Sequence, residues 1–338
     1  MCSIFPSRLA VPAAALCLSG LLLAHPHAAA VGFSQGITLC VHTLLPALFP
    51  FFVTCSLVTA SCSRKSSFAA ALLLSWLGGY AVCAGLVHDL HAQGKISPRK
   101  AQLLLLLGCC SGPGFVIGSV GGQMLGSITI GLILYTAQLA ANLLCVPVLW
   151  PLIVRQKTDT LPEAATVSPA AASGTLSAAI VGAVNSCLCV GGTVIFFRIL
   201  QALWMEMFPA LSFLSPVVCA VLEISAGCTD FAQRGGSLAL PGICLCMSAL
   251  GISVFTQLHA LVQGTADLRL LLLSRLMHIP VMALIVHLAV RVLPVQAAVF
   301  SSLAPRVIAV NRVSPDAALV VFLFLCAVLY KIRKKNYN

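Results

Sequence analysis

The sequence predicts an all-α polytopic membrane protein made of two inverted repeats, with one further span before them and one after. Of its 338 residues, 60% are hydrophobic and only 8% are charged, which is too little charge for the surface of a water-soluble domain. Apolar runs long enough to cross a bilayer recur along the chain. Two of these runs are interrupted at corresponding positions, and paired interruptions of this kind are typical of secondary transporters.

Residues 1–35 are predicted to form an N-terminal span, with its apolar run at 8–25. The same stretch has the basic start, short apolar core and following small residues of a signal peptide. We favour a retained span, because the rest of the chain is polytopic.

Residues 36–150 are predicted to form the first repeat. Its parts are a long span at 36–62, a hairpin at 67–90, an interrupted span at 101–122 and a last span at 128–150. Gly78, Gly79 and Tyr80 suit the apex of a re-entrant hairpin. The interruption is Ser111-Gly112-Pro113-Gly114, where a lipid-facing helix could not leave its backbone unpaired.

Residues 151–175 are predicted to be a linker, residues 176–292 the second repeat, and residues 293–338 a C-terminal span with a basic tail. The second repeat has the same order of parts: a span at 176–204, a hairpin at 214–229, an interrupted span at 236–262 and a span at 270–292. Its interruption is the stretch 248–257, the counterpart of the first.

Basic residues predict the orientation. If every run crossed the membrane, the loop with Lys95, Arg99 and Lys100 would face outside, against the positive-inside rule. A hairpin at 67–90 returns this loop to the inside, and a second hairpin places the tail KIRKKNYN in the cytoplasm. The first repeat then begins outside and the second inside, so the two repeats are inverted.

Residues near the interruptions and hairpin apices are predicted to bind a solute, because freed N–H groups attract anions and freed carbonyls attract cations. Glu223 is the only acidic residue well inside an apolar run of the repeats, and a carboxylate in a membrane costs about 2.5–3.5 kcal/mol on insertion scales. Packing of the glycines, an interfacial Glu223, and hydrogen bonds between helices remain alternatives. The predicted binding residues are Gly79, Tyr80, Ser111, Gly112, Gly114, Phe115, Glu223, Ser225, Gly227, Ser253 and Gln257.

No catalytic residue and no metal site are predicted. The chain has no His-Glu-x-x-His, and its 16 cysteines lie mostly in apolar runs, where they suit packing. His88 and His91 beside Asp89 are interpreted as solvated at the membrane edge, and Arg275 and His278 as interfacial. No cofactor is expected, apart from a coupling Na⁺ or H⁺. In a span of small apolar residues, Asn185 is expected to contact another helix.

Five stretches give the chain a family resemblance: GITLCVHTLLPALFPFF (36–52), GGYAVCAGLVHDLHAQGKIS (78–97), GPGFVIGSVG (112–121), LEISAG (222–227) and LGISVFTQ (250–257). In this order and spacing they resemble the YlbJ-type sporulation integral membrane proteins, which carry the nucleoside-recognition gate domain twice. This chain departs from the family at Ala81 and Cys83, where the family usually has Pro and Gly, and at Leu250 and Phe255, where Gly and His are common.

The resemblance implies two gate-type repeats, a transporter-like fold and a role in spore cortex formation in the plasma or forespore membrane. We expect a secondary transporter of a small anionic metabolite, similar to dipicolinate. A non-transporting scaffold of spore assembly and a nucleoside permease remain alternatives. The expected partners are membrane lipid and a small solute. Nucleic acid is not expected although the net charge is +11, because the basic residues lie in loops that orient the chain. Whether the protein forms an oligomer is left open.

Overall fold

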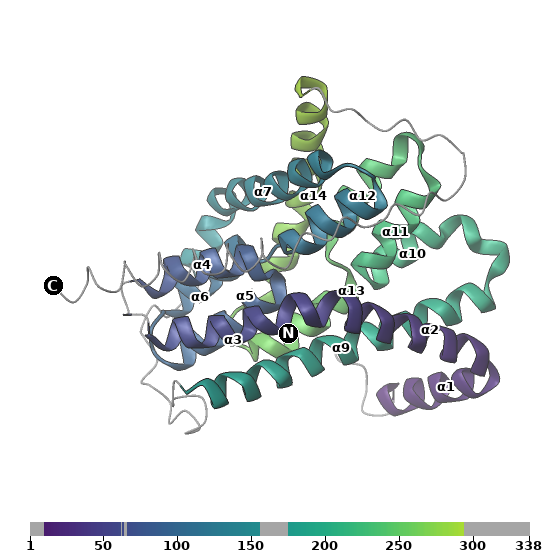
Figure 1. Cartoon of the computed structure of the whole chain (residues 1–338), viewed down its shortest axis with the longest axis horizontal. Coiled ribbons are helices and arrows are strands. Elements are labelled where there is room, and N and C mark those ends of the chain that lie inside the picture. Colours follow the sequence, from purple (N-terminus) through teal and green to yellow (C-terminus); the bar gives the residue numbers. More distant parts are fainter. Residues whose placement is uncertain (1–9, 62, 64–65, 156–174, 294–338) are drawn as a thin grey trace. The chain divides into compact units, whose positions relative to one another are not determined.

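The computed structural model describes residues 10–61, 63, 66–155 and 175–293, and every regular element in these ranges is a helix (Figure 1). The chain divides into two units, residues 1–298 and 299–338, and the second unit lies outside the described residues. The predicted C-terminal span and most of the predicted linker lie outside them as well.

The elements of the described part are α1 (Ala10–Ala24), α2 (Pro26–Leu39), the π-helix η1 (Cys40–Leu44), α3 (Leu45–Ser61), α4 (Ser67–Gly78), α5 (Tyr80–Ala92), α6 (Pro98–Gly108), the π-helix η2 (Gly114–Met124), α7 (Ile128–Val154), α9 (Leu176–Met207), the 3₁₀ helix η3 (Pro209–Leu214), α10 (Ser215–Leu222), α11 (Ile224–Arg234), the 3₁₀ helix η4 (Gly236–Leu238), α12 (Ala239–Ala249), α13 (Gly251–Val262) and α14 (Leu268–Val292).

Four segments of the described part are long and apolar enough to cross a membrane: α7, α9, the segment Gly236–Val262 and α14. The bent pair of α1 and α2 makes a fifth if it counts as one span. Large apolar side chains stay exposed on three of these helices, such as Leu143, Leu188 and Leu276, which are 50%, 68% and 62% exposed. Water would oppose this exposure and lipid tails favour it. The predicted all-α membrane protein is confirmed.

The N-terminal helices differ from the predicted boundaries. The stretches Pro12–Ala24 and Pro26–His42 are bent by 98° relative to each other, because His25 leaves the helical conformation and Pro26 starts a new helix without needing its missing N–H. From Pro26 the chain stays helical through η1 and α3 to Ser61, so the long helical segment begins ten positions before the predicted 36. The predicted boundary between residues 35 and 36 therefore falls inside α2.

Helices α4 and α5 form a hairpin around Gly79, which has a φ of +85°. The Nζ atom of Lys95, just after α5, donates to the carbonyl of Ala60 near the end of α3, at 3.4 Å. The chain thus returns to the level at which it entered the hairpin. This is the arrangement that the Gly78-Gly79-Tyr80 pattern suggests.

Helix α6 and η2 together run antiparallel along α7. At one end, Arg99 donates to the Val154 carbonyl at 3.0 Å, and at the other, the Ser127 N–H donates to the Gly121 carbonyl at 2.7 Å. The chain between α6 and η2, residues 109–113, is not helical apart from its last residue. The interruption therefore lies part-way along the packed helix α7, as the sequence suggests.

The second half of the described chain has the same order of parts. Helix α9 is long, α10 and α11 form a hairpin around Glu223, α12 and α13 are separated by a break at Leu250, and α14 is long. At the break, Leu250 and Gly251 both have positive φ values, +67° and +72°. A positive φ is costly for a leucine, and it interrupts the helix here because no α-helical residue adopts it.

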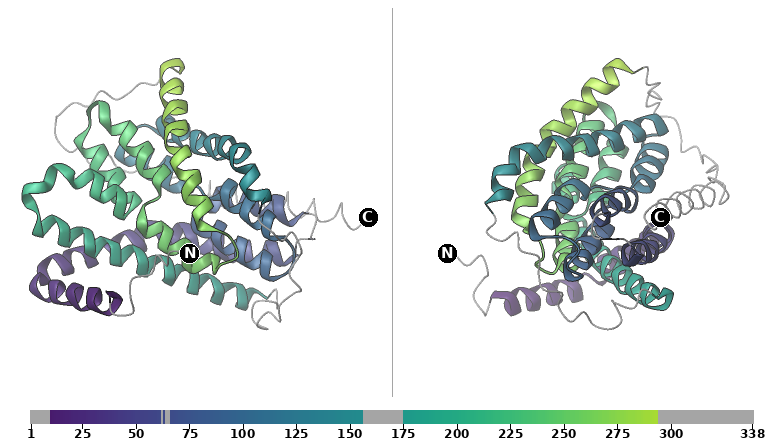
Figure 2. Two further views of the ribbon diagram at one scale, coloured as in Figure 1. Left: turned by 180° about the vertical axis from the view of Figure 1, so that it is seen from behind. Right: turned by 90° about the vertical axis from the view of Figure 1, so that its left-hand side faces the viewer.

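The long helical segment formed by α2 and α3 packs antiparallel to α9 (Figures 1 and 2). The Cys40 thiol lies 3.7 Å from the Gly191 carbonyl, and eight residues earlier Gly32 lies against Ile199. The same holds for α7 and α14, in which Gln138 contacts His278 and Asn142 contacts Arg275.

We expect the close packing of α2 on α9 to depend on Gly32. A Cβ atom there would lie 2.6 Å from the Ile199 Cα atom, whereas a Cβ atom at Gly192 on α9 meets nothing within 4 Å. Gly32→Ala should lower the free energy of unfolding by about 1–3 kcal/mol through overpacking. Gly192→Ala should leave the thermal unfolding midpoint of the detergent-purified protein unchanged or slightly higher. Equal midpoints for the two variants would contradict this packing.

Candidate functional site

A cavity of about 390 Å³ lies where several irregular stretches meet. Its wall combines the apex of the α4–α5 hairpin, the break after α6, the first turns of η2 and the tip of the α10–α11 hairpin, with side chains from η1, α3 and α9. The predicted binding residues that line it are Gly79, Tyr80, Ser111, Gly112, Gly114, Phe115, Glu223 and Ser225. Gly227, Ser253 and Gln257 do not line it.

The apex of each hairpin rests against the helix break of its own half. A Cβ atom on Gly79 would lie 3.0 Å from the Gly112 nitrogen, and the positive φ of Gly79 also disfavours any other residue. In the second half, a Cβ atom on Gly251 would lie 3.1 Å from the Ala220 carbonyl and 3.4 Å from the Glu223 nitrogen. Glycine thus lets backbone approach backbone at both places.

The backbone of Ser111 is held by one amide side chain. Gln138 of α7 accepts a hydrogen bond from the Ser111 N–H at 3.2 Å and donates one to the Ser111 carbonyl at 2.7 Å. Both backbone groups are buried, so each would destabilise the fold if its hydrogen bond to Gln138 were missing. The Ser111 hydroxyl is also buried, yet it has no hydrogen-bond partner among the described residues.

The carbonyls that α6 leaves free at its end are bound by side chains from other helices. Asn142 donates to the Leu107 and Cys109 carbonyls at 3.3 and 3.2 Å, and Trp76 donates to the Leu107 carbonyl at 3.1 Å. Arg275 also approaches the Cys109 carbonyl, at 3.4 Å. These contacts supply the hydrogen bonds that the interrupted helix cannot make for itself.

Arg275 and His278 are buried, so their interpretation as interfacial residues is wrong. They are 2% and 1% exposed, between α7, α12 and α14. Arg275 donates to the Asn142 side chain at 2.7 Å, and none of the described carboxylates is paired with it. It lies instead at the end of α6, where the carbonyls carry a partial negative charge that favours a cation. The positive-inside rule considers basic residues only in loops, so it could not predict that Arg275 binds the end of α6.

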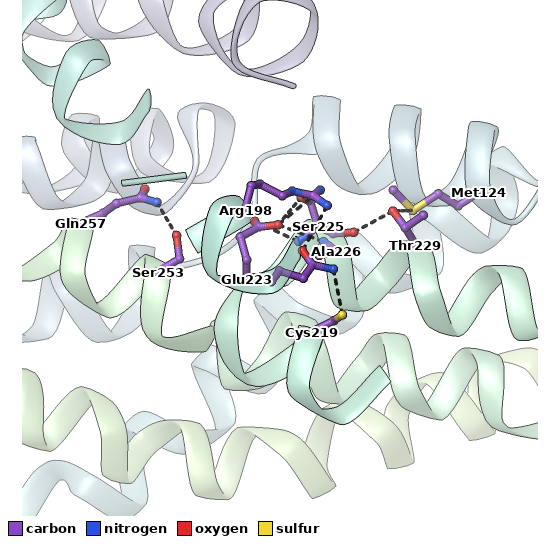
Figure 3. A network of polar contacts seen from close by, with 10 residues as sticks. Met124, Arg198, Cys219, Glu223, Ser225, Ala226, Thr229, Ser253 and Gln257 are labelled. Carbon is purple, nitrogen blue, oxygen red and sulfur yellow. Dashed lines mark hydrogen bonds and ion pairs between the residues drawn. The ribbon is translucent and has the colours of Figure 1, made fainter. Parts of the chain in front are cut away.

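Glu223 is the N-cap of α11 and is only 3% exposed. Its carboxylate accepts hydrogen bonds from the N–H groups of Ser225 and Ala226 at 3.1 and 2.9 Å, and one from the Ser225 hydroxyl at 2.5 Å (Figure 3). These donors explain why the sequence places an acid at this hairpin tip: it satisfies N–H groups that the start of a helix leaves unpaired. The interfacial alternative for Glu223 does not fit this burial.

Arg198 of α9 is the basic partner of this carboxylate, and the sequence analysis missed it. Its Nη2 atom lies 3.5 Å from Glu223 and donates to the Ser225 hydroxyl at 2.9 Å (Figure 3). The positive-inside rule treats Arg198 as a loop residue, although it stands in the apolar stretch VIFFRIL of a long helix. A lone arginine in such a stretch is the signal that indicates a buried partner.

Two helices begin at the cavity without a side chain that caps them. They are α5, whose first residue is Tyr80, and η2, whose first residue is Gly114. The N–H groups at such ends carry a partial positive charge. The cavity therefore combines two positive helix ends, the Ser111 hydroxyl and the paired charges of Glu223 and Arg198.

The remaining predicted residues lie elsewhere in the bundle. Gly227 is packed against Ala220 and the Cys246 sulfur, each 2.7 Å from the position of a Cβ atom. Gln257 donates to the Ser253 hydroxyl at 3.2 Å on α13, in a fully buried pair (Figure 3). Asn185 is exposed on α9, so the expected contact with another helix is wrong.

Searches of protein-family models, curated proteins and solved structures found no match to this chain. In the described ranges, no group of three or more His, Cys, Asp and Glu residues is placed so that it could hold a metal ion. The chemistry of the cavity is therefore inferred from the geometry of the residues that line it.

We expect the Glu223–Arg198 pair to stabilise the hairpin tip. Because breaking a buried pair leaves a charge uncompensated, Glu223→Ala should cost about 3 kcal/mol of unfolding free energy. The double variant with Arg198→Met should cost less than the sum of the single variants, with a coupling of about 0.5–3 kcal/mol in chemical unfolding. Additive single effects would contradict the pairing.

We expect Asn142 to be needed for the break. Asn142→Leu removes one hydrogen-bond partner from the Leu107 carbonyl, the Cys109 carbonyl and Arg275. Each buried group that stays unpaired should lower the free energy of unfolding by about 1–3 kcal/mol. The control Asn185→Leu makes the same change on an exposed face and should leave the unfolding midpoint in detergent unchanged. A small effect of Asn142→Leu would mean that the break does not depend on this side chain.

Proposed function

We propose that this protein is a secondary transporter of a small anionic metabolite, which binds in the cavity between the first helix break and the second hairpin tip. The observation that carries the proposal is the convergence of the first helix break and the tips of both hairpins on one partly polar cavity in a helical membrane protein. Irregular backbone is tolerated at membrane depth where it is buried or lines a cavity. The volume of about 390 Å³ suits a small-molecule site.

We further propose that residues 36–150 and 176–292 are inverted gate-type repeats, which alternate access by moving against each other. Two observations support this. Both halves have the order long helix, hairpin, interrupted segment and long helix. The corresponding long helices pack antiparallel, as an in-plane two-fold relation requires. In this proposal the cytoplasm holds the basic tail, and Na⁺ or H⁺ drives transport.

The charge of the solute follows from the groups around the cavity. The uncapped starts of α5 and η2 favour an anion, and the Ser111 hydroxyl is free to donate a hydrogen bond. The negative charge of Glu223 is opposed by Arg198, whose Nε atom is buried and has no partner among the described residues. A carboxylate is the group that suits these donors best.

A planar ring is the second property that the wall favours, since Phe51, Tyr80 and Phe115 line the cavity. With the carboxylate, this supports dipicolinate as the solute and a role in spore and cortex formation, in the plasma or forespore membrane. The same aromatic side chains are compatible with a nucleoside, so a nucleoside permease is the second candidate. A non-transporting scaffold would need no such cavity, and we assign no enzymatic activity.

Uptake by the purified protein in liposomes tests the proposal. With dipicolinate inside or outside and an imposed Na⁺ or H⁺ gradient, we expect saturable movement of dipicolinate that uridine does not inhibit. Movement of uridine alone would favour the permease. If neither solute moves under either gradient, the transporter proposal fails.

Gly114→Leu and Gly118→Leu are a matched pair for the location of the site. Both glycines are in η2 and a Cβ atom at either meets nothing within 4 Å, but only Gly114 lines the cavity. Both variants should fold, and Gly114→Leu should reduce dipicolinate uptake at least tenfold while Gly118→Leu retains it. Equal uptake by the two variants would mean that the solute does not bind in this cavity.

A further inference from the structure

A second, smaller cavity of about 150 Å³ lies between α3, α5, α9 and α13. Polar side chains from all four helices or their ends contribute to its wall, among them Ser56, His88, Asp89, Ser186 and Gln263. It is too small for a ring-sized metabolite but large enough for an ion and a few water molecules.

Asp89 is the only carboxylate in this wall, and its charge is not compensated by any described lysine or arginine. No Lys or Arg lines the cavity, and the described ion pairs do not include Asp89. Its carboxylate also has no hydrogen bond to a described residue, although the side chain is only partly exposed. Since a half-buried carboxylate without a partner is poorly solvated, a positive charge is expected to accompany it.

The neighbouring His88 strengthens this expectation. Its Nδ1 atom is buried and has no hydrogen-bond partner among the described residues, although the residue as a whole is half-buried. The other titratable side chain in the wall is Cys55 of α3, and the parts of α9 and α13 that line the cavity contribute none. Helix α13 ends beside the cavity at Val262, and the carbonyls at such an end favour a cation.

We propose that this cavity binds one small monovalent cation, with Asp89 as the residue that receives its charge. The cation is either Na⁺, held by the Asp89 carboxylate with the oxygens of Ser186 and Gln263, or a proton on Asp89 itself. Both neutralise the Asp89 carboxylate, and they differ in the number of oxygen ligands that they need. Cation binding is measured without any solute, so this site stands or falls independently of the transport proposal.

The cation site is also connected to the larger cavity through two helices. Phe52 of α3 and Val82 of α5 line the small cavity, and their chain neighbours Phe51 and Ala81 line the large one. Occupation of one cavity can therefore change the side chains of the other. Resting on the proposed transport function, this connection assigns the smaller cavity as the place where a coupling ion acts.

Thermal unfolding of the full chain in detergent tests the site. Midpoints are measured in NaCl and in choline chloride of equal ionic strength, and in choline chloride between pH 5 and pH 8. For Na⁺, we expect NaCl to raise the midpoint of the wild type and not that of Asp89→Asn, with a weakened response in Ser186→Ala. For a proton, NaCl has no specific effect, and Asp89→Asn loses part of the pH dependence while Ser186→Ala keeps it.

Asp267→Asn is the matched control, because it removes the same charge while an asparagine still caps α14. It should respond to Na⁺ and pH as the wild type does. If Asp89→Asn does not fold, Gly182→Leu replaces it, since Gly182 lines the cavity and a Cβ atom there meets nothing within 4 Å. The proposal is overturned if the cavity variant responds to both Na⁺ and pH as the wild type does.

Discussion

The backbone hydrogen bonds of the interrupted helix are the constraint on which the rest of this structure depends. Once α6 stops at Gly108, its last carbonyls and the following peptide groups need partners that lipid cannot supply. Side chains of α7 and α14 supply them, foremost Gln138, Asn142 and Arg275. The break is therefore a built feature whose stability comes from the neighbouring helices, and a flexible kink would need none of these contacts.

The same constraint positions the cavity. Side chains of α4, α7 and α14 bind the Leu107, Cys109 and Ser111 carbonyls, and the other side of the break, where η2 begins, faces the hairpin tips. Gly79 lets the first apex lie on Gly112, and Arg198 holds the second tip through Glu223. Anion-attracting helix ends thus face the open space while these cation-attracting carbonyls are covered, which is the basis of the proposed preference for a negative solute.

Much of this arrangement could be predicted from residues that are unusual in a membrane. Glycine at 78, 79, 112 and 114 and the carboxylate of Glu223 stand out in apolar runs, and they identify the hairpins, the break and the cavity wall. Arg198 and Arg275 could not be assigned in this way, because orientation rules treat arginines as loop residues. The burial of His278 depends on packing between distant helices, which no local pattern encodes.

The location of the solute is the claim on which the functional proposal depends, and a density map of the protein in nanodiscs with saturating dipicolinate tests it most directly. We predict density for one ring between Gly112–Phe115 and Glu223–Ser225, with a carboxylate near the start of η2 and the Ser111 hydroxyl. A map in which this cavity stays empty at saturation, or in which the ring lies outside it, would contradict the proposed site.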